Sequence, residues 1–197
     1  GGTSYYDNLV VRRAGLMSAS RYLTRFGESL TALQTTPGRK VMPLGEASYL
    51  SWIKHYRPDE NSPNSAISYY LKGEIVCCLL DLTLRRETKD AKSFDDLLRA
   101  LWQRFGDGSG VPEDGVEKLA SELAGVDLKP FFARALHTVE ELDYSPFAHV
   151  GLEARFRVRE SANDKGGTAP RVKAGEDKPK GWLGVLTRGS GTIASVL

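Results

Sequence analysis

The sequence has little of the residue types that usually carry covalent or metal chemistry. Its 197 residues include three histidines and only two cysteines, Cys77 and Cys78. Adjacent residues on a helix point about 100° apart, so these thiols cannot ligate one metal ion with good geometry. A disulfide between neighbours would need a strained ring. We therefore predict that both cysteines act as small apolar side chains of the core.

An excess of one charge and long apolar runs are also absent. The 27 basic residues nearly balance the 25 acidic ones, giving a formal net charge of +2. No stripe of arginine and lysine with interleaved aromatics occurs, which argues against a nucleic-acid partner. No segment approaches the roughly 18–20 uninterrupted apolar residues of a membrane span. A hydrophobic content of 41% with 26% charged residues instead predicts a soluble chain with a real core.

Motifs for a reactive centre are missing as well. The sequence contains no H-E-x-x-H, phosphate-binding loop, dinucleotide-binding glycine pattern or G-x-S-x-G turn. The run from His137 begins like an inverted zinc motif but has Glu141 where a histidine is needed. His55 and His149 are isolated. We therefore predict no metal-ligating residues, and read locally the chain could not perform a reaction.

What the sequence does have is helical periodicity over its first two-thirds. The expected helices run from Thr3 or Ser4 to near Gly15, from Ser18 or Ser20 to before Thr36, through Ala47 to Ile53, from Ser65 to Arg86, from Ser93 to Gly106, from Gly115 to Leu123 and from Leu128 to Leu136. The fourth has the strongest pattern, a single wide apolar stripe formed by Ile67, Leu71, Ile75, Cys78, Leu79 and Leu82. Ser93 with Asp96 resembles a capping box.

The character of the sequence changes near residue 143. Residues 151–159 alternate between apolar and charged side chains, which predicts a half-exposed strand. Residues 160–180 are polar, and 182–186 and 192–197 read as two further strands. We place a domain boundary near residue 148, with a helical unit at 1–148 and a small β unit at 149–197.

Several segments together resemble one family. These are Gly2-Thr3-Ser4-Tyr5-Tyr6-Asp7, Thr36-Pro37-Gly38-Arg39, Tyr56-Arg57-Pro58-Asp59-Glu60-Asn61-Ser62 and Asn64 to Gly73. In order and spacing they resemble the PDZ-bearing glycyl aminopeptidases, a family of zinc metallopeptidases, over most of residues 2–150. The resemblance implies zinc bound by two histidines of H-E-x-x-H and by a glutamate in an E-G-x-T-S-Y-Y context. That glutamate would stand just before Gly1, so zinc is expected in a full-length parent and not in this chain.

The resemblance also implies a catalytic role for one tyrosine. Ser68 to Gly73 is similar to the I-x-Y-x-K-G pattern of the wider group, which places Tyr70 two residues before Lys72. Tyr70 would then donate a hydrogen bond to the oxyanion formed when water attacks the peptide carbonyl. Periodicity alone favours an ordinary helix aromatic at this position, and the neighbouring Tyr69 is the alternative assignment. The polar loop around Asp59 is left unassigned.

A second resemblance lies near the end of the sequence. Gly181, Trp182, Leu183, Gly184 and Val185 resemble the carboxylate-binding loop of a PDZ domain, which would hold a peptide C-terminus through backbone N–H groups. The helix that lines such a peptide groove would follow Leu197.

We therefore expect a mainly α fold, the helical C-terminal half of a thermolysin-like catalytic domain, followed by a few strands of an incomplete PDZ-like domain. The resemblance implies part of a bacterial zinc aminopeptidase that removes N-terminal residues, with small ones such as glycine favoured, and this chain alone is expected to be inactive. The alternative is a non-catalytic scaffold with a PDZ-like peptide-binding module. Self-association is expected where the upstream half would pack.

Overall fold

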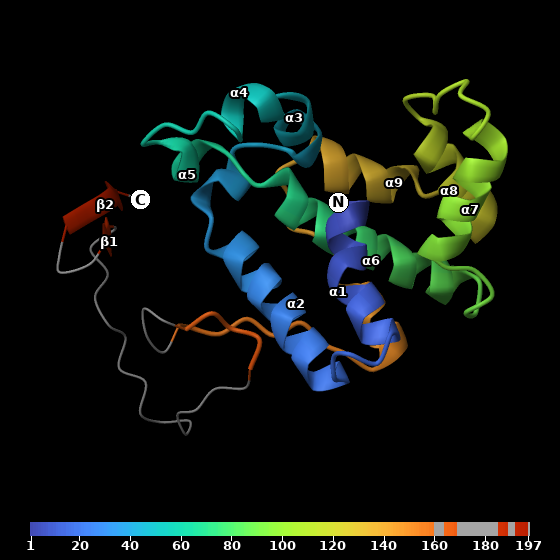
Figure 1. The fold of residues 1–197 in the computed structure, drawn as a ribbon, viewed down its shortest axis with the longest axis horizontal. Coiled ribbons are helices and arrows are strands. Elements are labelled where there is room, and N and C mark those ends of the chain that lie inside the picture. Colours follow the sequence, from blue (N-terminus) through green and yellow to red (C-terminus); the bar gives the residue numbers. More distant parts are fainter. Residues whose placement is uncertain (160–163, 169–184, 189–191, 197) are drawn as a thin grey trace.

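The computed structural model describes residues 1–159, 164–168, 185–188 and 192–196. These residues are mainly helical, as predicted (Figure 1). The elements are α1 (Gly2–Arg13), α2 (Ala19–Gln34), η1 (Pro37–Lys40), α3 (Leu44–Tyr49), α4 (Ser51–Lys54), α5 (Ser62–Ser65), α6 (Tyr69–Glu87), α7 (Phe94–Phe105), α8 (Gly115–Ala124), α9 (Lys129–Phe132), the π-helical η2 (Ala133–His137), η3 (Ser145–Val150), β1 (Val185–Arg188) and β2 (Thr192–Val196).

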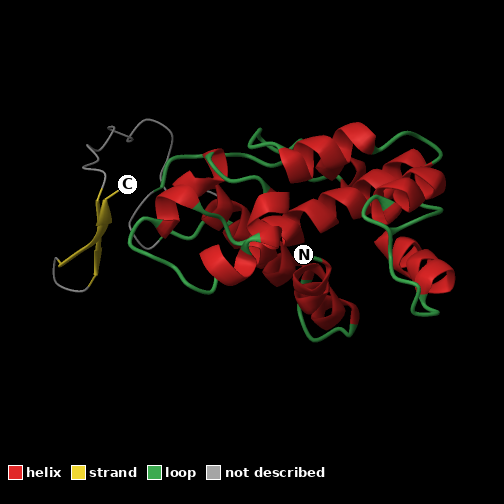
Figure 2. Cartoon of the chain, turned by 90° about the horizontal axis from the view of Figure 1, so that it is seen from above, coloured by secondary structure: helices red, strands yellow, loops and turns green. Residues whose placement is uncertain are grey.

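Helix α6 is the centre of the helical body. It contacts α1, α2, α3, α7, α8 and η3, and lies among these helices (Figure 1). Figure 2 shows the helical body from above, apart from the strand pair. Twelve of its 19 residues are buried, including the charged Lys72, Glu74 and Asp81. The single apolar stripe expected from the sequence is therefore wrong in extent. Neighbouring helices cover nearly every residue from Lys72 to Leu84, so the polar residues in the middle of α6 are covered as well.

Several helix ends follow from local chemistry. The Ser18 side chain accepts a hydrogen bond from the Arg21 N–H and caps α2, as predicted. Ser93 and Asp96 form the predicted capping box of α7, which ends at Gly106. Helix α8 ends at Gly125, whose φ of +69° lies in the left-handed region that glycine adopts without strain.

Other expected boundaries are wrong. Helix α1 begins at Gly2, before the expected caps Thr3 and Ser4. Helix α6 is capped by Ser68, because Ser65 ends the separate short helix α5 and an extended residue, Ala66, follows it. The third expected helix is divided at Leu50, whose backbone leaves helical geometry between α3 and α4.

Residues 151–159 are not a strand, contrary to the alternation in the sequence. A strand requires a paired neighbour, and this segment pairs with none of the described strands. Its apolar residues contact the helical body instead: Ala154 packs against the main core, and the Phe156 ring lies 5.7 Å from the Tyr144 ring. The described strands β1 and β2 form an antiparallel pair with an irregularity between Leu186 and Thr187.

The sequence predicts no membrane span, and the described helices can be checked for one. None of the helices in these ranges combines the length and the apolar character needed to cross a bilayer.

Candidate functional site

Tyr70 lies in the first turn of α6, where that helix reaches the surface. Its side chain is 41% exposed, whereas most of the helix after it is buried. The Ser68 side chain accepts a hydrogen bond from the Leu71 N–H and fixes the start of the helix. The phenol of Tyr70 is therefore held by a rigid element and remains accessible to another molecule.

Three tyrosine hydroxyl groups meet at this position, and we call Tyr56, Tyr69 and Tyr70 the tyrosine cluster. The Tyr56 hydroxyl oxygen lies 2.8 Å from that of Tyr70 and 3.1 Å from that of Tyr69. The Tyr69 and Tyr70 rings are 4.2 Å apart, although the two residues are neighbours on one helix. Tyr69 packs partly against the small apolar cluster of Met42, Ala47 and Ile67.

The hydrogen bonds of the cluster affect the two helix tyrosines in opposite directions. Hydrogen bonds with Tyr56 and Tyr70 raise the pKa of the Tyr69 phenol. Hydrogen bonds with Tyr56 and Tyr69 lower the pKa of the Tyr70 phenol. The three phenols therefore form one hydrogen-bonded group, in which the protonation of each tyrosine depends on its neighbours.

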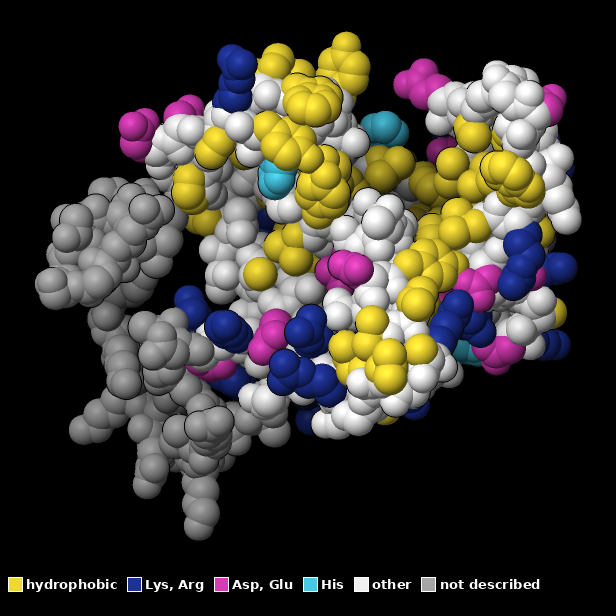
Figure 3. Space-filling view, in the orientation of Figure 1, with side chains coloured by type: hydrophobic (Ala, Val, Ile, Leu, Met, Phe, Trp, Pro, Cys, Tyr) yellow, Lys and Arg dark blue, Asp and Glu magenta, His cyan; other side chains and the backbone are white. Residues whose placement is uncertain are grey.

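Aromatic side chains from α4 and the loop after it surround the cluster. The Trp52 and Tyr56 rings are 5.1 Å apart, and the His55 ring lies within 5.2–5.7 Å of all three tyrosine rings. Trp52 is 77% exposed, and Figure 3 shows hydrophobic side chains gathered over α3 and α4. The site therefore combines hydroxyl groups with an accessible aromatic surface.

Gly73 lies one turn after Tyr70 and allows the start of the chain to approach α6 closely. A Cβ atom on Gly73 would lie 2.7 Å from the Gly1 Cα atom, closer than real side chains come. The adjacent Lys72 is buried, and burial lowers the pKa of its amine. Both residues of the Lys72-Gly73 pair thus serve packing, whereas Tyr70 is exposed.

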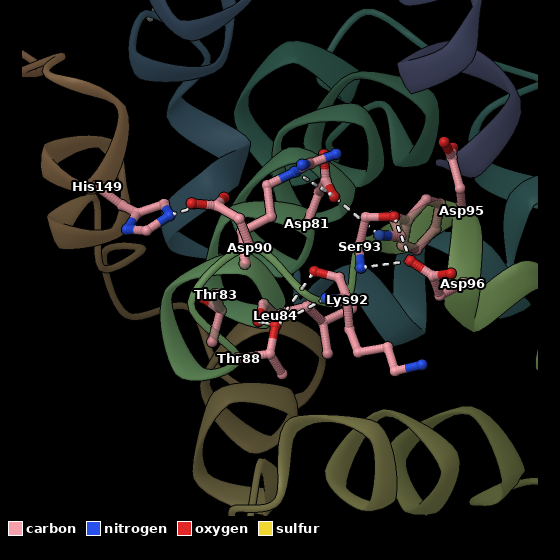
Figure 4. Close-up of polar contacts among 12 residues, drawn as sticks. Asp81, Thr83, Leu84, Thr88, Asp90, Lys92, Ser93, Asp95, Asp96 and His149 are labelled. Atoms are coloured by element: carbon pink, nitrogen blue, oxygen red, sulfur yellow. Dashed lines mark hydrogen bonds and ion pairs between the residues drawn. The ribbon is translucent and has the colours of Figure 1, made fainter.

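A buried carboxylate farther along α6 anchors the neighbouring helices. Asp81 accepts hydrogen bonds from the Tyr5 hydroxyl at 2.7 Å, the Phe94 N–H at 2.8 Å and the Arg85 Nε at 3.1 Å. Figure 4 shows Asp81 beside the capping box of Ser93 and Asp96. Because its donors come from α1, α6 and the start of α7, we assign Asp81 a structural role.

The polar loop around Asp59 makes most of its hydrogen bonds within itself. The Asp59 side chain accepts from the Asn61 N–H at 3.0 Å and from the Ser62 hydroxyl at 2.9 Å. These contacts form the turn that leads into α5. The turn has a structural function, because it lies between Tyr56 and the start of α6.

The described residues do not supply a metal site. Among them, no three histidine, cysteine, aspartate or glutamate side chains lie close enough to hold one ion. Cys77 and Cys78 are free thiols in and beside the core, as predicted, and burial raises the pKa of both. The donor set of this part of the chain therefore does not fit zinc.

A cavity of about 640 Å³ lies away from the tyrosine cluster. Its walls come from α2, η3 and residues 152–157, 164 and 166–168 and include Phe26, Phe147 and Phe156. The tyrosine cluster is the stronger candidate, because it presents a polar donor held on a rigid helix.

The predicted PDZ-like loop lies almost wholly beyond these ranges. Gly181, Trp182, Leu183 and Gly184 are outside the described residues, and Val185 is the first residue of β1. Tyr56, by contrast, carries no local signal of a role in the sequence. It belongs to one of the family-like segments, but no spacing rule connects it to a residue 14 positions later.

Comparisons with known proteins agree with a peptidase-like helical fold. Residues 1–76 match the sequence profile of the M61 glycyl aminopeptidases. The crystal structure of an aminopeptidase N family protein from Idiomarina loihiensis matches this chain with a TM-score of 0.79 and 31% sequence identity, over 86% of this chain. A search of curated proteins found no match. Both similarities are to proteins named as aminopeptidases.

The chain spans 29% of the length of the Idiomarina protein. The matched part contains Tyr5, Tyr56 and Tyr70 within the 1–76 segment that the glycyl aminopeptidase profile covers.

Proposed function

We propose that this chain is the helical, supporting part of a zinc-dependent aminopeptidase, in which Tyr70 stabilises the oxyanion of peptide hydrolysis. The observation that carries this proposal is the position of the Tyr70 hydroxyl, exposed at the first turn of α6 and bonded to Tyr56. The match of residues 1–76 to glycyl aminopeptidases supports the reaction class.

The close contact of Gly1 with Gly73 supports the location of the reaction. Tyr70 and Gly73 are three residues apart on α6 and therefore lie on one face of the helix. In the family pattern, the third zinc-binding glutamate precedes the glycine at the position of Gly1. A residue at that place would lie beside the Tyr70 face, because the Gly1 backbone packs directly on Gly73.

Zinc, when bound in such a peptidase, activates the water that attacks the peptide carbonyl. The described residues do not hold it, so its ligands would come from a longer protein. The contribution of this chain is a hydrogen-bond donor on a rigid helix, aimed at the place where the carbonyl oxygen becomes negative. Such a donor stabilises charge that exists only in the transition state.

The substrates follow from the same resemblance. We propose that the full protein removes N-terminal residues from peptides, with small residues such as glycine favoured. We also propose that Gly181 to Val185 belong to a PDZ-like module that binds a peptide C-terminus through backbone N–H groups. The 197-residue chain alone is expected to show no peptidase activity.

Tyr70→Phe in a longer, active form of the protein tests the assignment. Loss of the donor should lower kcat by about 10²–10³-fold with unchanged zinc content. Tyr49→Phe is the matched control, since Tyr49 is 87% exposed and lies outside the tyrosine cluster. The measurement is steady-state hydrolysis of a glycyl substrate together with metal analysis.

Near-normal kcat in Tyr70→Phe would remove Tyr70 from this role. If Tyr69→Phe lowered kcat by this amount and Tyr70→Phe did not, the role would belong to Tyr69. A longer protein that binds no zinc would contradict the peptidase proposal. In that case the non-catalytic scaffold with a peptide-binding module would take its place.

A further inference from the structure

The Tyr56 hydroxyl bridges Tyr69 and Tyr70, the two tyrosines of α6. The number of protons available limits the directions of these two hydrogen bonds. A phenol has one proton to donate and can accept two hydrogen bonds. Tyr56 contacts Tyr69 at 3.1 Å and Tyr70 at 2.8 Å, so it can donate to only one of them. If Tyr69 donates to Tyr56 and Tyr56 donates to Tyr70, the proton of Tyr70 remains free for another acceptor.

The surroundings of the two helix tyrosines favour this order. Tyr69 packs partly against Met42, Ala47 and Ile67, so its side chain is less exposed than that of Tyr70. Tyr70 is more exposed, so its proton can point to water or to a bound molecule. The raised pKa of Tyr69 and the lowered pKa of Tyr70 agree with Tyr69 as donor and Tyr70 as acceptor within the cluster.

Tyr56 is itself held in place, although half of its surface is exposed. Its ring lies 5.1 Å from the Trp52 ring in a tilted arrangement, and the His55 ring lies nearly perpendicular to it at 5.2 Å. The Tyr56 N–H donates to the Ser51 carbonyl at 3.0 Å, which ties the residue to α4. The Tyr56 side chain is therefore held by contacts with α4 and the residue after it, as well as by the tyrosines of α6.

We propose that Tyr56 is a positioning residue, whose hydroxyl group donates to Tyr70 and turns the Tyr70 proton toward the substrate carbonyl oxygen. This inference rests on the proposed role of Tyr70. The Tyr70 hydroxyl rotates about its C–O bond in solution, and a hydrogen bond accepted from Tyr56 selects one orientation. A donor oriented in advance needs no reorganisation as the oxyanion forms.

The first test uses the 197-residue chain and needs no activity. Tyrosine labelled with ¹³C at Cζ gives one signal for each phenol, and Tyr69→Phe and Tyr70→Phe identify the two signals. In Tyr56→Phe, the Tyr70 phenol should titrate at higher pH and the Tyr69 phenol at lower pH, each moving toward the ordinary value of about 10. Tyr49→Phe, the matched control, should leave both titrations unchanged. Unchanged Tyr69 and Tyr70 titrations in Tyr56→Phe would overturn the bridge.

The second test uses a longer, active protein. Tyr56→Phe should lower kcat about 3–10-fold and leave KM nearly unchanged, because one neutral hydrogen bond is lost and substrate contacts are not. Adding Tyr56→Phe to Tyr70→Phe should cost nothing further, since a positioning residue has no effect once its target is gone. An equal effect of Tyr56→Phe in both backgrounds would overturn the positioning role.

The two tests separate this inference from the proposed function. If Tyr56→Phe shifted the titrations of Tyr69 and Tyr70 but the longer protein had no peptidase activity, the peptidase proposal and the positioning role would both be contradicted. The hydrogen-bonded bridge between the hydroxyl groups would still stand. If Tyr56→Phe left the titrations of Tyr69 and Tyr70 unchanged while Tyr70→Phe still lowered kcat as expected, only the role of Tyr56 would be contradicted.

Discussion

Asp81 illustrates how single residues hold this helical body together. Its carboxylate is only 5% exposed and is surrounded by three donors from different segments. A buried charge is tolerated when hydrogen bonds replace the water that it loses. The Tyr5 hydroxyl is the donor that comes from farthest along the sequence, 76 residues away, so it connects α1 to the central helix.

Tyr5→Phe should therefore destabilise the chain. The substitution keeps the ring but leaves one buried acceptor of Asp81 without its donor, at a cost of about 1–3 kcal/mol in the free energy of unfolding. Urea unfolding followed by circular dichroism measures the effect. Tyr49→Phe, on an exposed side chain, should change the free energy of unfolding by less than about 0.5 kcal/mol. Equal values for the two variants would show that the Asp81 contact does not contribute.

At the scale of one element, α7 depends on the capping box at its start. The Asp96 carboxylate accepts hydrogen bonds from the Ser93 N–H at 2.9 Å and the Ser93 hydroxyl at 2.7 Å. These bonds hold the pKa of Asp96 below its ordinary value. Stability from this group is present above the unfolded pKa of about 3.9 and is lost as pH falls through the lower folded pKa.

Asp96→Ala should lower the free energy of unfolding by about 1 kcal/mol at pH 7. The difference from the parent chain should shrink below about pH 4, because Asp96 of the parent then becomes protonated. Denaturant unfolding at a series of pH values gives this comparison. Glu113→Ala, in an exposed loop, should show no such trend, and a pH-independent loss in Asp96→Ala would contradict the charge-based explanation.

The two short helices α4 and α5 show which elements the sequence predicted poorly. The cap of α2 and the capping box of α7 were predictable, because Ser18, Ser93 and Asp96 act within one turn of their own helix. The division of the helix at Leu50 and the turn around Asp59 were not predictable from the sequence. Both depend on the path of the chain between α3 and α6. The tyrosine cluster depends on that path, because it brings Tyr56 to Tyr70.

At the scale of the whole molecule, large apolar side chains remain on the surface. Trp102 on α7 is 75% exposed, almost as much as Trp52 on α4. Figure 3 shows hydrophobic side chains over both regions. Accessible apolar patches of this kind favour association with another surface.

We predict that the chain self-associates as its concentration rises. Trp102→Gln should weaken this association by removing apolar area from the surface, without loss of helical structure. Light scattering across a concentration series measures the average mass, and circular dichroism checks the fold. A mass that stays that of a monomer at every concentration would contradict the prediction.

The sequence by itself determined the mainly helical architecture, the cysteines as core residues and the capping of α2 and α7, because helical periodicity and caps are local properties. It also carried the resemblance from which Tyr70 was chosen. Only the tertiary structure decided that α6 is buried almost wholly between Lys72 and Leu84, that residues 151–159 pair with none of the described strands, and that Tyr56 meets Tyr69 and Tyr70. These features depend on contacts between segments distant in sequence, which no local pattern encodes.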